Sequence, residues 1–134
     1  MGYCMSMREQ DFFVPVENLP AMVEAIHALS GKETIGDSSG RHFSWVDQNF
    51  HTITDPKRLL DAWRWDAVFN DNGDIDTIYF GGEKLGDDEV LFTAIGHLVK
   101  AGSYIEMQGE DGCLWRWVFD GKSMTEQSAT ITWE

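Results

Sequence analysis

Cysteine is scarce in this chain, because Cys4 and Cys113 are the only two among 134 residues. Two cysteines are too few for a disulfide scaffold or for a zinc site with four thiolate ligands. The sequence also has no apolar run near the roughly 20 residues that cross a bilayer. It has no segment with the charged and then apolar pattern of a signal peptide. These absences predict a protein of the reducing cytoplasm that does not insert into a membrane.

Basic residues are outnumbered by acidic ones. Ten Lys and Arg stand against 23 Asp and Glu, so the formal net charge is −13 and the isoelectric point is near 4.5. Binding to phosphate-rich surfaces depends on clustered Lys and Arg, so direct nucleic-acid binding is not expected. The negative charge either keeps the protein in solution or attracts a partner protein with a basic surface.

Motifs of known catalytic and metal chemistry are also absent. No Gly-rich phosphate loop and no serine in a nucleophile elbow occur in the sequence. The acid-rich stretch NDNGDID (70–76) lacks the glycine and glutamate positions of an EF-hand. The histidines do not have the spacing of a zinc site, and they are His27, His42, His51 and His97. We therefore predict no metal, cofactor or catalytic residue, and we favour a non-enzymatic role.

The chain does contain enough apolar material for a core. Hydrophobic residues make up 43% and aromatic residues 13% of a length that suits one domain, 1–134. Hydrophobic periodicity and turn residues predict strands at 11–16 and 42–46, with a polar, mobile loop at 32–42. Helices are predicted at 17–31, 54–63 and 86–103, from their caps and apolar stripes. Three further strands are predicted at 103–107, 114–119 and 128–133.

The clearest hairpin covers residues 65–82. Its two alternating runs flank Asn72-Gly73, the pair that a type I′ turn prefers. The order of elements predicts a single α+β domain with a mostly antiparallel sheet and three helices packed on one face.

The triplet Trp-Arg-Trp occurs twice, at 63–65 and 115–117. Side chains alternate along a strand, so Trp115, Trp117 and Phe119 should share one face while Arg116 points to the other. The first copy crosses a helix-to-strand junction, so the two copies should differ in geometry. Packing in the core is the interpretation we favour for these large rings.

The two arginines of these triplets need carboxylate partners wherever they are buried. For Arg64 and Arg116, the nearby candidates are Glu106, Glu110 and Asp111. One interpretation is an ion pair that braces the sheet. The other is an exposed face of Arg and Trp, the composition of an interface hot spot.

Several motifs carry a resemblance to a known group of proteins. The start MGYCM, the segment LLDAWRWDAVF and the segment GSYIEMQGEDGCLWRW resemble a family of small uncharacterised proteins encoded by phages, plasmids and bacterial genomes. The ending at 75–119 also resembles ferredoxin-like domains of plasmid and phage proteins. The resemblance implies a cytoplasmic protein associated with a mobile element, and it transfers no activity or site residue.

Three functional hypotheses follow from the sequence. The first is an acidic, non-enzymatic binding protein of phage or mobile-element type that blocks a basic host or defence protein. The second is a nucleotide-like ligand site or enzyme with a pocket of Trp and Arg, and the third is a homodimeric structural protein. The candidate binding residues are Trp45, Arg64, Glu110, Asp111, Trp115, Arg116 and Trp117.

Overall fold

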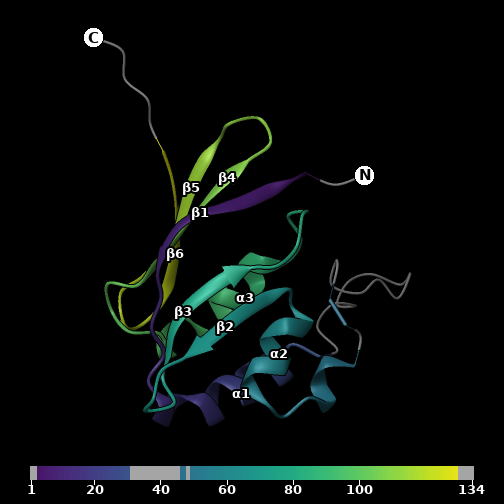
Figure 1. Cartoon of the computed structure of the whole chain (residues 1–134), viewed down its shortest axis with the longest axis vertical. Coiled ribbons are helices and arrows are strands. Elements are labelled where there is room, and N and C mark those ends of the chain that lie inside the picture. Colours follow the sequence, from purple (N-terminus) through teal and green to yellow (C-terminus); the bar gives the residue numbers. More distant parts are fainter. Residues whose placement is uncertain (1–2, 31–45, 48, 130–134) are drawn as a thin grey trace.

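The computed structural model describes residues 3–30, 46–47 and 49–129 of the chain (Figure 1). The predicted loop at 32–42 and nearly all of the predicted strand at 42–46 lie outside these residues. Within them, three α-helices and six strands form an α+β fold, as predicted. The helices are α1 (Leu19–His27), α2 (Pro56–Ala62) and α3 (Asp88–Ile95). The strands are β1 (Met5–Asp11), β2 (Trp65–Phe69), β3 (Ile75–Phe80), β4 (Tyr104–Gly109), β5 (Leu114–Phe119) and β6 (Met124–Ser128).

The strands pair only in the antiparallel sense, in two sheets that meet along β1 and β3. One sheet has the order β1-β4-β5-β6, and the other is the β2-β3 hairpin. Two antiparallel bridges, Cys4 with Lys84 and Val14 with Ile75, join the sheets at either end of β1. Between them, the Gln10 side chain accepts a hydrogen bond from the Ile78 backbone N–H.

The combined strand order is therefore β2-β3-β1-β4-β5-β6. Its first four strands follow the ferredoxin-like β-α-β-β-α-β pattern, in which each helix connection skips over one antiparallel strand. Helix α2 is an addition to the first connection, and β5 and β6 extend the sheet beyond β4. This finding supports the resemblance to ferredoxin-like domains.

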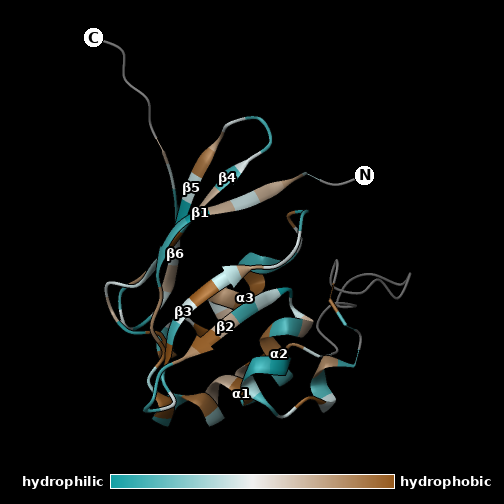
Figure 2. Cartoon of the chain, in the orientation of Figure 1, coloured by the Kyte–Doolittle hydropathy of each residue, from teal (hydrophilic) through white to brown (hydrophobic). Residues whose placement is uncertain are grey.

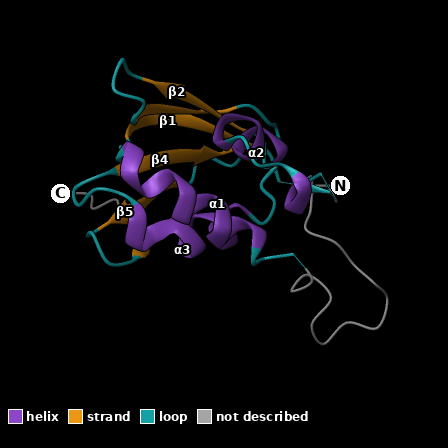
Figure 3. Cartoon of the chain, turned by 90° about the horizontal axis from the view of Figure 1, so that it is seen from below, coloured by secondary structure: helices purple, strands orange, loops and turns teal. Residues whose placement is uncertain are grey.

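The helices cover one side of this layer of strands (Figure 3). Apolar residues of α1, α3 and the inner faces of the strands form a single core, and brown segments of the ribbon mark several of them (Figure 2). Trp63, Trp65 and Trp117 are fully buried in it. Phe92 of α3 lies among them, with ring centroids 4.9 Å from Trp65 and 5.4 Å from Trp117.

One predicted strand lies in the wrong place, and another falls mostly outside the described residues. The first strand runs over Met5–Asp11, and the apolar segment 12–16 makes only the single bridge at Val14. Pro15 leads instead into a 3-10 turn at Val16–Asn18. A strand that the sequence did not predict covers Met124–Ser128, whereas most of the predicted range 128–133 lies outside the described residues. Both strands are largely polar, and β1 has a bulge between Met7 and Glu9 that breaks its alternation. Apolar content was therefore a poor guide to the positions of these strands.

The hairpin turn is also of a different type from the prediction. Gly73 donates its backbone N–H to the Asn70 carbonyl and has a φ of 87°, whereas Asn72 has no positive φ. A type I′ turn needs positive φ at both central residues, so this is not one. The Asn70 side chain accepts hydrogen bonds from the backbone N–H groups of Asn72 and Asp74, and this holds the wider loop.

The predicted helices are present but shorter. Asp55 caps α2 by accepting a hydrogen bond from the Arg58 N–H. Asn18 does not cap α1, because its side chain donates to the Leu98 carbonyl. Helix α3 ends at Ile95 and continues as a 3-10 turn at Gly96–Leu98, which packs against β6. A Cβ at Gly96 would lie 2.7 Å from the Met124 backbone nitrogen.

Candidate functional site: an acidic pocket with an aromatic wall

The two Trp-Arg-Trp triplets have different structures, as predicted. In β5, Trp117 is fully buried on the inner face and Trp115 is half-buried beside it, while Arg116 lies on the opposite face. In the first copy both tryptophans are buried, because Arg64 adopts a left-handed backbone with a φ of 72° between α2 and β2. That reversal lets Trp63 and Trp65 both face the core. An exposed surface of alternating Trp and Arg therefore does not form at either copy.

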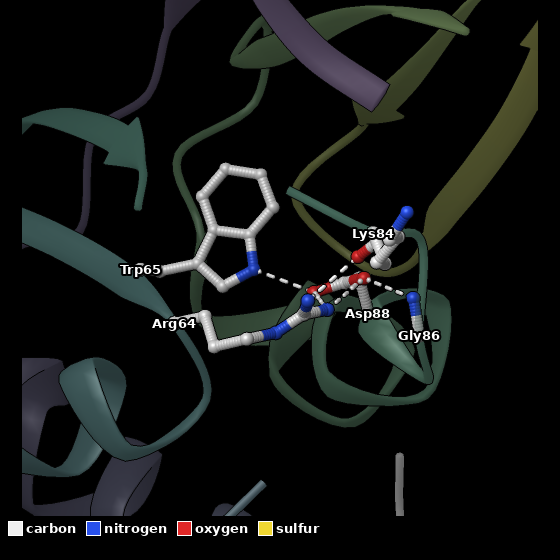
Figure 4. A network of polar contacts seen from close by, with 5 residues as sticks. All are labelled: Arg64, Trp65, Lys84, Gly86 and Asp88. Carbon is white, nitrogen blue, oxygen red and sulfur yellow. Dashed lines mark hydrogen bonds and ion pairs between the residues drawn. The ribbon is translucent and has the colours of Figure 1, made fainter. Parts of the chain in front are cut away.

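Arg64 belongs to a buried polar network (Figure 4). Its Nη2 lies 3.0 Å from an oxygen of Asp88, whose side chain is almost entirely buried. The same carboxylate accepts hydrogen bonds from the Trp65 indole at 2.9 Å and from the Gly86 backbone N–H at 3.0 Å. Arg64 also donates to the Lys84 carbonyl at 2.6 Å. These four contacts join the start of β2 to the segment before α3, and they hold that segment in place.

Arg116 forms an ion pair with Glu106, one of the three carboxylates that the sequence offered as partners. Its Nε lies 2.7 Å from the Glu106 carboxylate, to which Arg8 of β1 also pairs at 3.3 Å. The Arg116 guanidinium lies over the Tyr104 ring, 4.8 Å from the centroid, and the carboxylate raises the pKa of Arg116 further above its ordinary value. These contacts brace β1, β4 and β5 on the outer face. The charge of Arg116 is thus already compensated.

A pocket of about 640 Å³ lies on the other face of β5 and β6. Its apolar wall includes Trp115, Trp117 and Leu85. Its acidic residues come from three separate places: Glu89 from α3, Asp111 from the β4–β5 turn and Glu126 from β6. Among the described residues that line it there is no lysine or arginine, and none of the three carboxylates pairs with one elsewhere in the described chain. The pocket therefore joins aromatic surface to uncompensated negative charge.

Tyr3 closes one side of this pocket. Leu85 donates its backbone N–H to the Tyr3 carbonyl, and Cys4 donates its own to the Glu110 side chain at 2.8 Å, so the chain is fixed on both sides of the ring. The phenol passes over Gly109, where there is no room for a Cβ. Its hydroxyl donates a hydrogen bond to Asp111. The ring lies 6.4 Å from that of Trp115, so the two aromatic side chains form one corner of the pocket.

The Asp111 carboxylate controls the protonation of its neighbours. The hydrogen bond between Tyr3 and Asp111 raises the pKa of Tyr3 to about 12 and lowers that of Asp111. Asp111 also raises the pKa of the Cys113 thiol, by a hydrogen bond and by its charge. At neutral pH the phenol and the thiol are neutral, and Asp111 keeps its negative charge. The acidic character of the pocket is thus maintained over the physiological range.

The structure brings together only part of the predicted site. Asp111, Trp115 and Trp117 line the pocket, and Glu110 supports its Tyr3 corner through Cys4. Arg64 and Arg116 lie elsewhere, in the buried network and on the outer face. Trp45 lies outside the described residues. The site is therefore aromatic and acidic, and not the mixture of tryptophan and arginine that the sequence suggested.

Sequence reasoning missed five residues that contribute to these two sites. Asp88 stands among several acids near the start of α3, and its burial beside Trp65 is what selects it as the partner of Arg64. The pocket residues were missed because they come from distant segments, and they are Tyr3, Leu85, Glu89 and Glu126. Alternation along 124–128 would have placed Glu126 on the same face as Trp117, if a strand had been predicted over these residues. Its carboxylate accepts the Trp117 indole N–H at 2.9 Å.

The described residues have neither a candidate metal site nor a candidate membrane span. They contain no group of three or more His, Cys, Asp and Glu side chains placed to hold a metal ion. None of their helices combines the length and the apolarity that crossing a lipid bilayer requires. Of the four histidines, His51 lies in a 3-10 turn at Phe50–Thr52, and His42 is outside the described residues.

Comparisons with known proteins give no relative for this chain. No protein-family model matches it, and no curated protein or solved structure matches it significantly. The resemblance to phage and plasmid proteins stays a prediction, and the site must be interpreted from its own chemistry.

Proposed function

We propose that this protein is a non-enzymatic binding protein whose pocket receives a lysine or arginine side chain of a partner protein. The observation that carries the proposal is the set of three carboxylates, Glu89, Asp111 and Glu126, around the half-buried Trp115, with no lysine or arginine among the described residues that line the pocket. A guanidinium or ammonium group gains both from nearby carboxylates and from the face of an aromatic ring.

The size and charge of the molecule support the same conclusion. A pocket of about 640 Å³ has room for an arginine side chain together with part of its backbone. The net charge of −13 would speed the approach of a basic protein through long-range attraction. From the sequence resemblance, the proposed target is a basic host or defence protein encountered by a phage or another mobile element.

A nucleotide-like ligand has less support. Phosphate would be repelled by the three carboxylates of the main pocket. The adjoining hollow on the outer face, about 340 Å³, contains Arg116, but that side chain already pairs with Glu106. The homodimer hypothesis would bring two chains of charge −13 together, which makes a basic partner the better fit.

The pocket can be tested with single amino-acid probes. N-acetyl-arginine amide would be titrated into the protein at low salt, with tryptophan fluorescence and calorimetry as readouts, and N-acetyl-citrulline amide would serve as the neutral probe of the same shape. We expect saturable binding of the arginine probe, weakening as salt is added, and no binding of the citrulline probe.

A matched pair of triple variants separates the pocket from the overall charge. Glu89→Gln, Asp111→Asn and Glu126→Gln together should lower the affinity for the arginine probe about tenfold or more. The control triple removes the same charge from exposed acids near α1 and α2, and it consists of Glu17→Gln, Glu24→Gln and Asp61→Asn. Equal loss of affinity in the two triples, or no binding by the unmodified protein, would overturn the proposal.

A further inference from the structure

Strand β6 forms the outer edge of the larger sheet, and its register decides which of its backbone groups are free. Ala129 donates its N–H to the Leu114 carbonyl, and Gln127 and Thr125 lie opposite Arg116 and Val118. In an antiparallel ladder the residues that bond to one neighbour alternate with residues that face the other side. The N–H and C=O groups of Glu126 and Ser128 therefore point away from β5, toward the open edge.

The two ends of this edge are not equivalent. At the first residue of β6, the Gly96 turn lies against the backbone so closely that a Cβ at Gly96 would be 2.7 Å from the Met124 nitrogen. Glu126 and Ser128 are exposed, and no described residue bonds to their outward N–H and C=O groups. Unpaired edge groups of this kind are a template for another strand.

The open edge borders the acidic pocket. Glu126 and Ser128 both line the pocket, and the Glu126 side chain lies on the inner face, where it bonds the Trp117 indole. A residue paired directly opposite Glu126 would place its side chain on that same face, with Cβ atoms about 5 Å apart. Every second side chain of an added strand would then point toward the pocket.

We propose that the partner contributes an extended basic segment, which adds to the sheet as an antiparallel strand beside β6 and places alternate Arg or Lys side chains over the acidic pocket. This inference rests on the proposed function, and it specifies how the cation is presented. Charge complementarity selects the occupant, because the inner face at this edge carries Glu126 with Glu89 nearby, whereas a second copy of this chain would bring more negative charge. We place the added strand antiparallel because all neighbouring strands of this sheet pair in the antiparallel sense.

The proposal makes a specific prediction about backbone methylation. The probe is the peptide acetyl-Thr-Arg-Thr-Arg-Thr-amide, and its arginines pair with Glu126 and Ser128. Because those two residues face outward, the arginine N–H groups donate to β6 and the N–H of the central threonine points away. N-methylation of either arginine should weaken binding about fivefold or more, and N-methylation of the central threonine should leave it unchanged.

A variant of the protein tests the same contact from the other side. Ser128→Pro removes one outward N–H without touching the ladder to β5, and Ser128→Ala keeps that N–H. We expect Ser128→Pro to weaken binding of the peptide more than Ser128→Ala does, because only the proline removes the outward N–H. A peptide of the same composition with adjacent arginines should bind more weakly than the alternating one.

The outcomes separate the two proposals. If the single arginine probe binds but methylation of arginine and of threonine has the same effect, strand addition is overturned and the pocket function stands. If only methylation of the threonine weakens binding of the peptide, the proposed antiparallel register is wrong. If the single arginine probe does not bind at all, the pocket function itself fails. A β6-mediated dimer that the peptide does not dissociate, seen by light scattering, would also overturn strand addition.

Discussion

The buried carboxylate of Asp88 offers the sharpest test of how this fold is held together. Asp88→Ala would remove the partner of the Arg64 guanidinium, whose side chain is only 15% exposed. It would also leave the Trp65 indole N–H and the Gly86 backbone N–H without their acceptor. The three donors come from two segments of the chain, so loss of the carboxylate would destabilise both segments.

The expected size of the effect follows from these contacts. Removing one member of a buried ion pair typically costs about 3–5 kcal/mol, because the other charge stays buried without compensation. For a domain whose total stability is about 5–15 kcal/mol, this is a large fraction. Asp88→Asn keeps an acceptor for the indole and removes the charge, so we expect a smaller loss of about 2–3 kcal/mol.

Urea unfolding followed by circular dichroism would measure these losses, and the control is Asp66→Ala. The Asp66 carboxylate also pairs with a cation, 2.8 Å from the Lys57 nitrogen, but both side chains are more than half exposed, at 57% and 54%. Such a surface pair contributes about 0–1 kcal/mol. If Asp88→Ala destabilised the protein no more than Asp66→Ala does, the network would not hold the fold as we argue.

Three further predictions concern other parts of the molecule. Gly96→Ala should destabilise the protein strongly, because the new methyl group would collide with the backbone at the start of β6. Gly112→Ala has open space around it and should cost only the about 1–2 kcal/mol of a left-handed backbone with φ of 86°, as thermal unfolding of both variants can measure. In an ultraviolet titration, Tyr3 should ionise near pH 12. Asp111→Asn should return its pKa toward 10, because the fold favours the neutral phenol that donates to the carboxylate. It follows that this contact stabilises the folded state fully between pH 3.8, the ordinary pKa of an aspartate, and pH 10, and loses its contribution as the pH rises through about 12, whereas with Asp111→Asn the high-pH loss should disappear. The same Asp111→Asn change should lower the pKa of the exposed Cys113 thiol and speed its alkylation near neutral pH, as mass spectrometry of the peptide containing it can follow; an unchanged rate would contradict the role of the carboxylate.

The sequence predicted the inner faces of the strands well. Alternation placed Trp117 and Phe119 in the core and Arg116 outside, because β5 is a regular strand with one covered face. The Asp55 cap of α2 was equally local and equally predictable. Patterns that act within a few residues along the chain were therefore sufficient for most of the elements.

The site could not be predicted to the same extent, because distant segments build it. Tyr3 and Asp111 are 108 residues apart, and no spacing rule relates them. The reversal at Arg64 also has no sequence signature, since a positive φ at a residue other than Gly, Asn or Asp is uncommon. Because this reversal cannot be predicted from the sequence, Arg64 could not be assigned to Asp88. The repeated triplet instead left open an exposed surface of tryptophan and arginine, which the described residues do not form.

The position of β1 has a consequence for how the chain is made. Met5 pairs with Gly109, so about a hundred residues are synthesised between β1 and its neighbour β4. Contacts between such distant positions slow folding, and a strand that waits exposes its edges to wrong partners. The polar composition of β1, MSMREQD, makes that delay tolerable, because a strand with few apolar side chains has little tendency to aggregate while it is alone.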